Sequence, residues 1–185
     1  MSKLARWWHA EDNGQIVCDL CPQKCSMTDG ASGHCGARYA KDGKLLTKAW
    51  EIGTYPVADP IEKKPLYHFL PGSKVLSFGL PGCNLNCAFC QNWSLSTSCD
   101  YGTLQNLTPE SCVQMALAQG CAAIAFTYNE PTISSEFCIE VSKKARRSGI
   151  KTIAVSNGYI SDGARNELFD MIDAANIDLK SIDPD

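Results

Sequence analysis

The sequence has little that points to nucleic acids, membranes or export. Its 17 basic residues are outnumbered by 20 acidic ones and form no long run, so the net charge of -3 gives no electrostatic support for a nucleic-acid partner. The first ten residues contain no apolar core or small-residue cleavage site of the kind that marks a signal peptide. Two uncharged stretches, residues 75–99 and 111–129, are interrupted by glycine and by proline or glutamine, and neither predicts a membrane-spanning helix.

Cysteine is the residue that stands out. The chain has 11 cysteines among 185 residues, about 6 %, which is below the roughly 8–10 % of disulfide-rich scaffolds, and an odd number cannot pair completely. A reducing cytoplasm is the natural compartment for so many thiols. We therefore expect a cytoplasmic protein whose cysteines serve metal or redox chemistry.

The pattern of polar and apolar residues changes near residue 75. Residues 1–74 consist of short pieces punctuated by glycine and proline, which predicts a small irregular module with four cysteines, followed by an extended linker. From residue 75 onward, short apolar runs alternate with helical patterns, as in βα units around a parallel sheet. The expected strands are 75–80, 122–127, 151–156 and 177–180, and the expected helices are 108–119, 132–148 and 162–174.

These patterns predict an α/β core over residues 75–185 behind an N-terminal module over residues 1–74. Thr108 followed by proline and glutamate is typical of a helix start, which fixes the first of the three helices. The fourth strand would be left with an unpaired edge and no covering helix. We therefore expect the chain to be a truncated piece of a longer fold.

The most informative segment follows the first strand. Cys83, Cys87 and Cys90 have the spacing C-x3-C-x2-C and lie in one loop, so their thiolates can point at one centre. A 4Fe-4S cluster normally takes four cysteine thiolates, and three would leave one iron open to another ligand. Two other interpretations are a zinc site that also uses Cys99, and a thioredoxin-like redox pair at Cys87 and Cys90.

This loop resembles the cluster-binding loop of radical S-adenosylmethionine (radical SAM) enzymes. The string Gly-Cys-Asn-x-x-Cys-x-Phe-Cys-Gln-Asn, which begins at Gly82, is similar to that of the pyruvate formate-lyase activating enzyme branch. The preceding four-cysteine module and the following Gln91-Asn92-Trp93 resemble the radical SAM member of the AmmeMemoRadiSam group. The resemblance implies a TIM-like (β/α)6 barrel, of which this chain would contain about the first four strands.

The resemblance extends to the ends of the later strands. Glu130-Pro131 is similar to the end of the Gly-Gly-Glu-Pro motif, which implies that Glu130 binds the amino group of S-adenosylmethionine, but Tyr128 and Asn129 replace the two glycines. Phe89 would pack near the adenine. The alternative for Glu130 is an acidic residue that caps the following helix.

Two further segments match the activating-enzyme branch in part. Ser156-Asn157-Gly158 is similar to the Asp-Thr-Asn-Gly segment that lies near the cofactor, but Val155 stands where that segment has its aspartate. The alternative is that Asn-Gly forms an ordinary turn. Asp178-Leu179-Lys180 matches an Asp-Leu-Lys segment whose acid and lysine face the cofactor. Alternation along a strand would put Asp178 and Lys180 on one side, and a solvated ion pair is the alternative.

The N-terminal cysteines suggest a second site. Cys18, Cys21, Cys25 and Cys35 supply four thiols, which saturate one zinc ion or one iron-sulfur cluster and leave no open position. Spacing does not distinguish the two metals. We expect His34 at the surface and see no clear partner for His9 or His68. The remaining cysteines fall in helix or strand patterns, where buried, unreactive thiols are expected: Cys99, Cys112, Cys121 and Cys138.

The resemblance implies a specific reaction. A 4Fe-4S cluster on Cys83, Cys87 and Cys90 would bind S-adenosylmethionine and, after receiving an electron from flavodoxin or ferredoxin, cleave it to a 5′-deoxyadenosyl radical. The radical would abstract hydrogen from an unknown substrate, which in the activating enzymes is a glycine of a partner protein. The rival hypotheses are a truncated, non-catalytic module that binds zinc or iron-sulfur, and a thiol oxidoreductase centred on Cys87 and Cys90.

Overall fold

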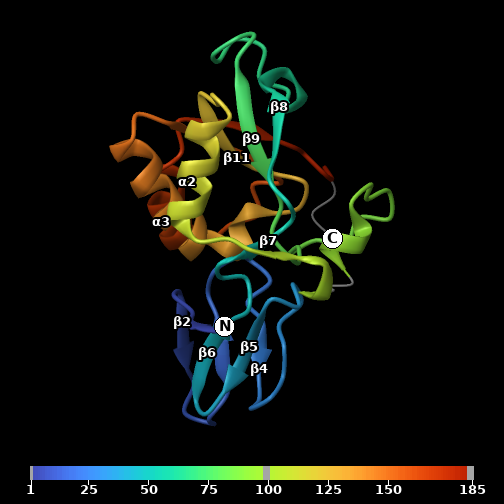
Figure 1. Cartoon of the computed structure of the whole chain (residues 1–185). Coiled ribbons are helices and arrows are strands. Elements are labelled where there is room, and N and C mark those ends of the chain that lie inside the picture. Colours follow the sequence, from blue (N-terminus) through green and yellow to red (C-terminus); the bar gives the residue numbers. More distant parts are fainter. Residues whose placement is uncertain (1, 98–100, 183–185) are drawn as a thin grey trace.

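The computed structural model describes residues 2–97 and 101–182. Figure 1 shows a group of short N-terminal strands below a larger sheet, with helices packed beside that sheet. The small strands are β1 (Lys3–Leu4), β2 (Trp8–Ala10), β3 (Ile16–Cys18), β4 (Ser26–Met27), β5 (Arg38–Lys41), β6 (Lys44–Thr47), β7 (Ile52–Gly53) and β10 (Gln105–Asn106). The larger sheet contains β8 (Val57–Pro60), β9 (Lys74–Phe78), β11 (Ala123–Phe126), β12 (Lys151–Ser156) and β13 (Ala174–Ile177).

The N-terminal region is more regular than the sequence predicts. Strands β1, β6 and β5 form one antiparallel sheet, and β2, β3 and β4 form another. The expectation of an irregular module is wrong in this respect. Each of these strands has only two to four residues, which is too short to leave a recognisable alternation of polar and apolar side chains.

The larger sheet confirms the predicted α/β class. Its strand order is β13-β12-β11-β9-β8, and the four strands β9, β11, β12 and β13 are mutually parallel. β8 pairs antiparallel with β9, so part of the segment expected to be a linker joins the sheet. Over the described residues the sheet is open, with β13 and β8 at its two edges. The division at residue 74 stays a prediction.

Three of the α-helices in the described chain occupy the predicted places with different ends, and the first, which follows the cysteine loop, was not predicted. They are α1 (Trp93–Ser96), α2 (Pro109–Ala118), α3 (Ser135–Arg147) and α4 (Asp162–Phe169), with short 3-10 helices η1 (Ile61–Lys63), η2 (Tyr101–Thr103) and η3 (Pro131–Ser134). Thr108 caps α2 as predicted, because its side chain accepts a hydrogen bond from the amide of Ser111. No helix in the described part of the chain has the length and apolar character needed to cross a membrane.

The fourth strand differs from the prediction. β13 covers Ala174–Ile177 and so begins three residues before the expected strand. Helix α4 ends at Phe169 instead of residue 174. Two alanines open the strand, and alanine favours a helix over a strand, so the sequence pattern extends the preceding helix to the first of them, Ala174. Asp178 and Lys180 therefore follow the strand and do not alternate along it.

A continuous core holds the sheet and helices together. Three strands of the parallel sheet are almost fully buried, and Phe78 on β9 meets Phe126 on β11 edge to face with ring centroids 5.7 Å apart. Cys112, Cys121 and Cys138 are buried in this core, which confirms the prediction for them. Cys99 lies outside the described residues.

Candidate functional site

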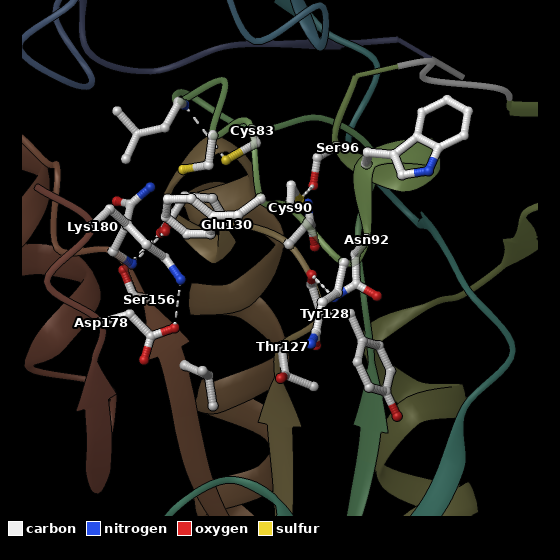
Figure 2. Close-up of a pocket in the computed structure, with 18 of the residues that line it drawn as sticks. Cys83, Cys90, Asn92, Ser96, Thr127, Tyr128, Glu130, Ser156, Asp178 and Lys180 are labelled. Carbon is white, nitrogen blue, oxygen red and sulfur yellow. Dashed lines mark hydrogen bonds and ion pairs between the residues drawn. The ribbon is translucent and has the colours of Figure 1, made fainter.

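A cavity of about 430 Å³ opens where the four parallel strands end. The lining comes from the loops after β9, β11, β12 and β13, together with the segment that follows β8. All nine residues predicted for the cluster and cofactor line it: Cys83, Cys87, Phe89, Cys90, Glu130, Ser156, Asn157, Asp178 and Lys180. Figure 2 shows side chains from these different strand ends facing the same space. Parallel strands bring their carboxyl ends to one edge, which explains why residues so far apart in sequence meet.

The three loop cysteines are half-buried at one side of the cavity. The amide of Leu85 donates to the Cys83 sulfur over 3.5 Å, and the Cys90 sulfur lies 3.8 Å from the Ser96 hydroxyl. Burial raises the pKa of the Cys83 thiol to about 11. Within residues 2–97 and 101–182, no three histidine, cysteine or acidic side chains are already gathered closely enough to hold a metal ion.

Asn129 fastens the cysteine loop to the end of β11. Its side-chain oxygen accepts a hydrogen bond from the Leu80 amide at 2.9 Å, and its amide nitrogen donates to the Gly82 carbonyl at 2.6 Å. Both partners lie between β9 and the first loop cysteine. Asn129 thus fixes the entry of the chain into the loop, a role that the sequence alone did not reveal.

Tyr128 takes the backbone conformation that a glycine would take easily. Its φ of +72° is in the left-handed region, and the Asn92 side chain donates to its carbonyl oxygen at 2.6 Å. Asn129 is not among the described residues with positive φ. Only one of the two positions that replace glycine therefore carries backbone strain.

Tyr128 is also held by a buried charged pair. Its hydroxyl donates to Asp59 at 3.0 Å, and the same carboxylate accepts from Lys64 at 2.9 Å and Lys63 at 3.0 Å. Burial opposes the charged form of Asp59, but the bonds from Lys64 and Lys63 outweigh it and lower the pKa to about 2. Burial and the bond to this carboxylate raise the pKa of Tyr128 to about 12. The sequence alone does not signal this group of four residues, because Asp59, Lys63 and Lys64 lie in the segment expected to be a linker.

Glu130 is 2 % exposed and points into the cavity wall. Its carboxylate accepts from the Thr132 amide at 2.9 Å, the Ser156 hydroxyl at 2.7 Å and the Asn157 amide at 2.7 Å. Burial raises its pKa, although all three hydrogen bonds act in the opposite direction. Glu130 is also the residue before η3 and caps it through Thr132, so the capping interpretation is realised alongside its place in the cavity.

The loop after β13 contributes a charged pair. Lys180 and Asp178 form an ion pair at 2.9 Å, and both line the cavity. The hydrogen bond to Asp178 raises the pKa of Lys180, and the nearby sulfurs of Cys87 and Cys90 act in the same direction. Asp178 itself is anchored by its backbone amide, which donates to the Ser156 carbonyl at 2.8 Å. The cavity therefore offers a cation close to the loop thiols.

Asparagines connect the cysteine loop to the end of β12. The side chain of Asn157 donates to the Asn84 side-chain oxygen at 2.9 Å, and Asn84 donates to the Tyr159 carbonyl at 2.6 Å. Phe89, by contrast, is 69 % exposed at the rim of the cavity. The loop is thus fixed at its base and open at its tip.

The histidine predictions meet different outcomes. His34 is exposed, as expected. The prediction that His9 has no partner is wrong, because its Nδ1 lies 2.7 Å from a carboxylate oxygen of Asp19. Asp19 follows β3 directly and faces β2 through the antiparallel pairing, a contact that could not be seen before the strands were placed.

Comparison with known proteins decides the family. Residues 78–185, more than half of the chain, match the Radical SAM superfamily. The chain belongs to this superfamily. The matched segment begins at the end of β9 and contains the cysteine loop and all later strand ends that line the cavity. Radical SAM proteins generally use a 4Fe-4S cluster and S-adenosylmethionine.

A curated relative covers almost the whole chain. It is an uncharacterized protein of Methanocaldococcus jannaschii, 36 % identical over 177 residues, which are 95 % of this chain and 53 % of that protein. The chain thus spans about half the length of the curated relative.

Proposed function

We propose that this radical SAM chain binds a 4Fe-4S cluster through Cys83, Cys87 and Cys90 and cleaves S-adenosylmethionine reductively. The observation that carries the proposal is that nine residues from four strand ends line one cavity. From sequence, these strand ends resemble motifs of radical SAM enzymes or of their activating-enzyme branch. Residues brought together from a span of about half the chain are harder to explain by chance than any single motif.

The residues fit such a cluster and cofactor. Among the described residues, the cavity lining contains three cysteines and no fourth, which would leave one iron open for S-adenosylmethionine. The cavity volume of about 430 Å³ falls within the roughly 300–1,000 Å³ of small-molecule sites. A cluster held by Cys83, Cys87 and Cys90 would supply one electron to the sulfonium of S-adenosylmethionine, whose carbon–sulfur bond would break to give methionine and a 5′-deoxyadenosyl radical.

The protein side chains bind and orient the cofactor. A carboxylate has about four acceptor positions, and Glu130 uses three of them within the chain, which leaves one for the amino group of S-adenosylmethionine. Ser156 and Asn157 hold that carboxylate in place. Phe89 at the rim would pack near the adenine, and the pair of Asp178 and Lys180 would face the cofactor.

We further propose a place within the superfamily. The loop string and the four-cysteine module favour the pyruvate formate-lyase activating enzyme branch and, within it, the AmmeMemoRadiSam group. The four parallel strands would be the first part of a TIM-like (β/α)6 barrel. Flavodoxin or ferredoxin would supply the electron, and the hydrogen donor would be an unknown substrate, such as a glycine of a partner protein.

The test is anaerobic reconstitution of wild-type protein and the Cys83→Ala and Cys121→Ala variants with iron and sulfide. Release of 5′-deoxyadenosine after reduction is then measured. Cys121 is buried away from the cavity, so its variant controls for the loss of a thiol elsewhere. We expect product from wild-type and Cys121→Ala protein and none from Cys83→Ala. Equal cleavage by Cys83→Ala contradicts the assignment, and bound metal without cleavage in wild-type protein favours a non-catalytic module.

A further inference from the structure

Four N-terminal cysteines meet around a second, much smaller cavity. Cys18 ends β3, Cys25 precedes β4, Cys21 lies in the turn between these strands, and Cys35 precedes β5. The Cys18 amide donates to the Cys25 carbonyl at 3.0 Å, which closes the hairpin. All four line the same enclosed space.

The size of this cavity favours one of the two metals that spacing leaves open. Its volume is about 20 Å³, and roughly 10–15 Å³ holds one water molecule. That is room for one ion, whereas a 4Fe-4S cluster brings eight atoms of its own. Four thiolates complete the tetrahedral shell of zinc and leave no open position.

Two polar groups lie beside the four cysteines. The backbone amide of His34 donates to the Cys25 sulfur at 3.3 Å. The guanidinium of Arg38, 1 % exposed, lines the cavity and is fixed by Glu136, whose carboxylate oxygens lie 2.6 and 2.5 Å from it. The four cysteines therefore share their cavity with a positively charged side chain whose charge is already paired with Glu136.

The small cavity lies directly beside the cysteine loop. Asn84, the residue after Cys83, lines it and is 1 % exposed, and its carbonyl accepts from the Gln23 side chain at 3.1 Å. A Cβ atom on Gly82 would lie only 2.4 Å from the carbonyl oxygen of Cys35. The two cavities therefore share a wall made of the chain on either side of Cys83.

We infer that Cys18, Cys21, Cys25 and Cys35 bind a single zinc ion that braces the cysteine loop from behind. The sulfurs are not yet gathered around one point in the described chain, so binding requires their side chains to turn toward the cavity. The ion performs no chemistry, because its shell is closed. Its effect on the radical SAM site is to hold Gly82 and Asn84 against the N-terminal strands.

The test measures zinc, iron and sulfide per chain in four anaerobically reconstituted proteins. They are wild-type, Cys25→Ser, Cys121→Ser, and the triple variant Cys83→Ala, Cys87→Ala, Cys90→Ala. We expect about one zinc in all except Cys25→Ser, which should have almost none. Iron and sulfide should be lost only from the triple variant, and this result tests the proposed function separately.

Three results overturn the zinc site. Iron in the triple variant, with or without sulfide, shows that the N-terminal cysteines hold iron. A folded triple variant without metal shows that they are ordinary thiols. If the triple variant does not fold, the zinc contents of wild-type protein and Cys25→Ser are compared instead. Equal zinc contents in these two proteins also refute the site. Where zinc is bound, a zinc chelator should lower the thermal unfolding midpoint of wild-type protein and leave that of Cys25→Ser unchanged.

Discussion

We predict that the close contact between Gly82 and Cys35 helps to hold the cysteine loop against the N-terminal strands. Gly82 has a φ of +93°, and an added Cβ would lie 2.4 Å from the carbonyl oxygen of Cys35, far inside van der Waals contact. The variant Gly82→Ala therefore suffers two separate penalties. A side chain at positive φ costs about 1–2 kcal/mol, and a forced overlap in a packed region costs about 1–3 kcal/mol more.

Gly120 provides a matched control. Its φ is +65°, but nothing lies within 4 Å of an added Cβ, so Gly120→Ala carries only the backbone penalty. We expect Gly82→Ala to lower the free energy of unfolding by about 2–5 kcal/mol and Gly120→Ala by about 1–2 kcal/mol. For a chain of this size, each kcal/mol shifts the thermal midpoint by roughly 2–4 °C.

The assay is anaerobic thermal unfolding followed by circular dichroism, with 5′-deoxyadenosine release measured on the same samples below the transition. The extra destabilisation of Gly82→Ala should be accompanied by slower cleavage, since the overlap displaces the chain next to Cys83. Equal midpoints for the two variants would show that the N-terminal strands do not press against the loop, and the reasoning about the shared wall would then be wrong.

Three other predictions concern the polar contacts around the cavity. The pKa of Asp59 is lowered from 3.8 to about 2, which contributes about 2 kcal/mol of stability above pH 4 that is lost as the pH falls toward 2. Asp59→Asn should therefore be less stable than wild-type protein at neutral pH. In urea unfolding, the difference in unfolding free energy between the two proteins should narrow in acid, and a constant difference would contradict this. Asn129→Ala loses two hydrogen bonds to the loop and should cost about 1–3 kcal/mol while weakening S-adenosylmethionine binding in calorimetry; unchanged affinity would exclude a positioning role. Glu136→Gln leaves the buried Arg38 charge without its carboxylate and should cost about 3–5 kcal/mol in denaturant unfolding, whereas a cost below about 1 kcal/mol would show that the pair is dispensable.

Part of this architecture could be predicted from the sequence. The strands β9, β11 and β12 are apolar runs buried on both faces, so their positions were close to those expected. Once these strands are parallel, the segments that follow them must meet at one edge, which is why the predicted residues share a cavity. Motifs that follow different strands can therefore predict a shared site even when they lie far apart in sequence.

Other parts depend on contacts that a linear pattern does not contain. β8 pairs with β9 through its backbone, and its value to the site comes from Asp59, whose partners Lys64 and Tyr128 are fixed only in the folded chain. Strand β13 was misplaced because its alanines are better helix formers than strand formers. The closeness of Gly82 to Cys35 likewise arises only when the N-terminal strands pack against the sheet.

The central claim is that the three loop thiols hold a 4Fe-4S cluster with one iron open to S-adenosylmethionine. Electron paramagnetic resonance of the dithionite-reduced protein, prepared anaerobically and measured with and without S-adenosylmethionine, tests it most directly. We expect a reduced-cluster signal that changes when S-adenosylmethionine is added and is absent from Cys83→Ala. Zinc without any cluster signal after reconstitution, or a signal that S-adenosylmethionine leaves unchanged, would contradict it.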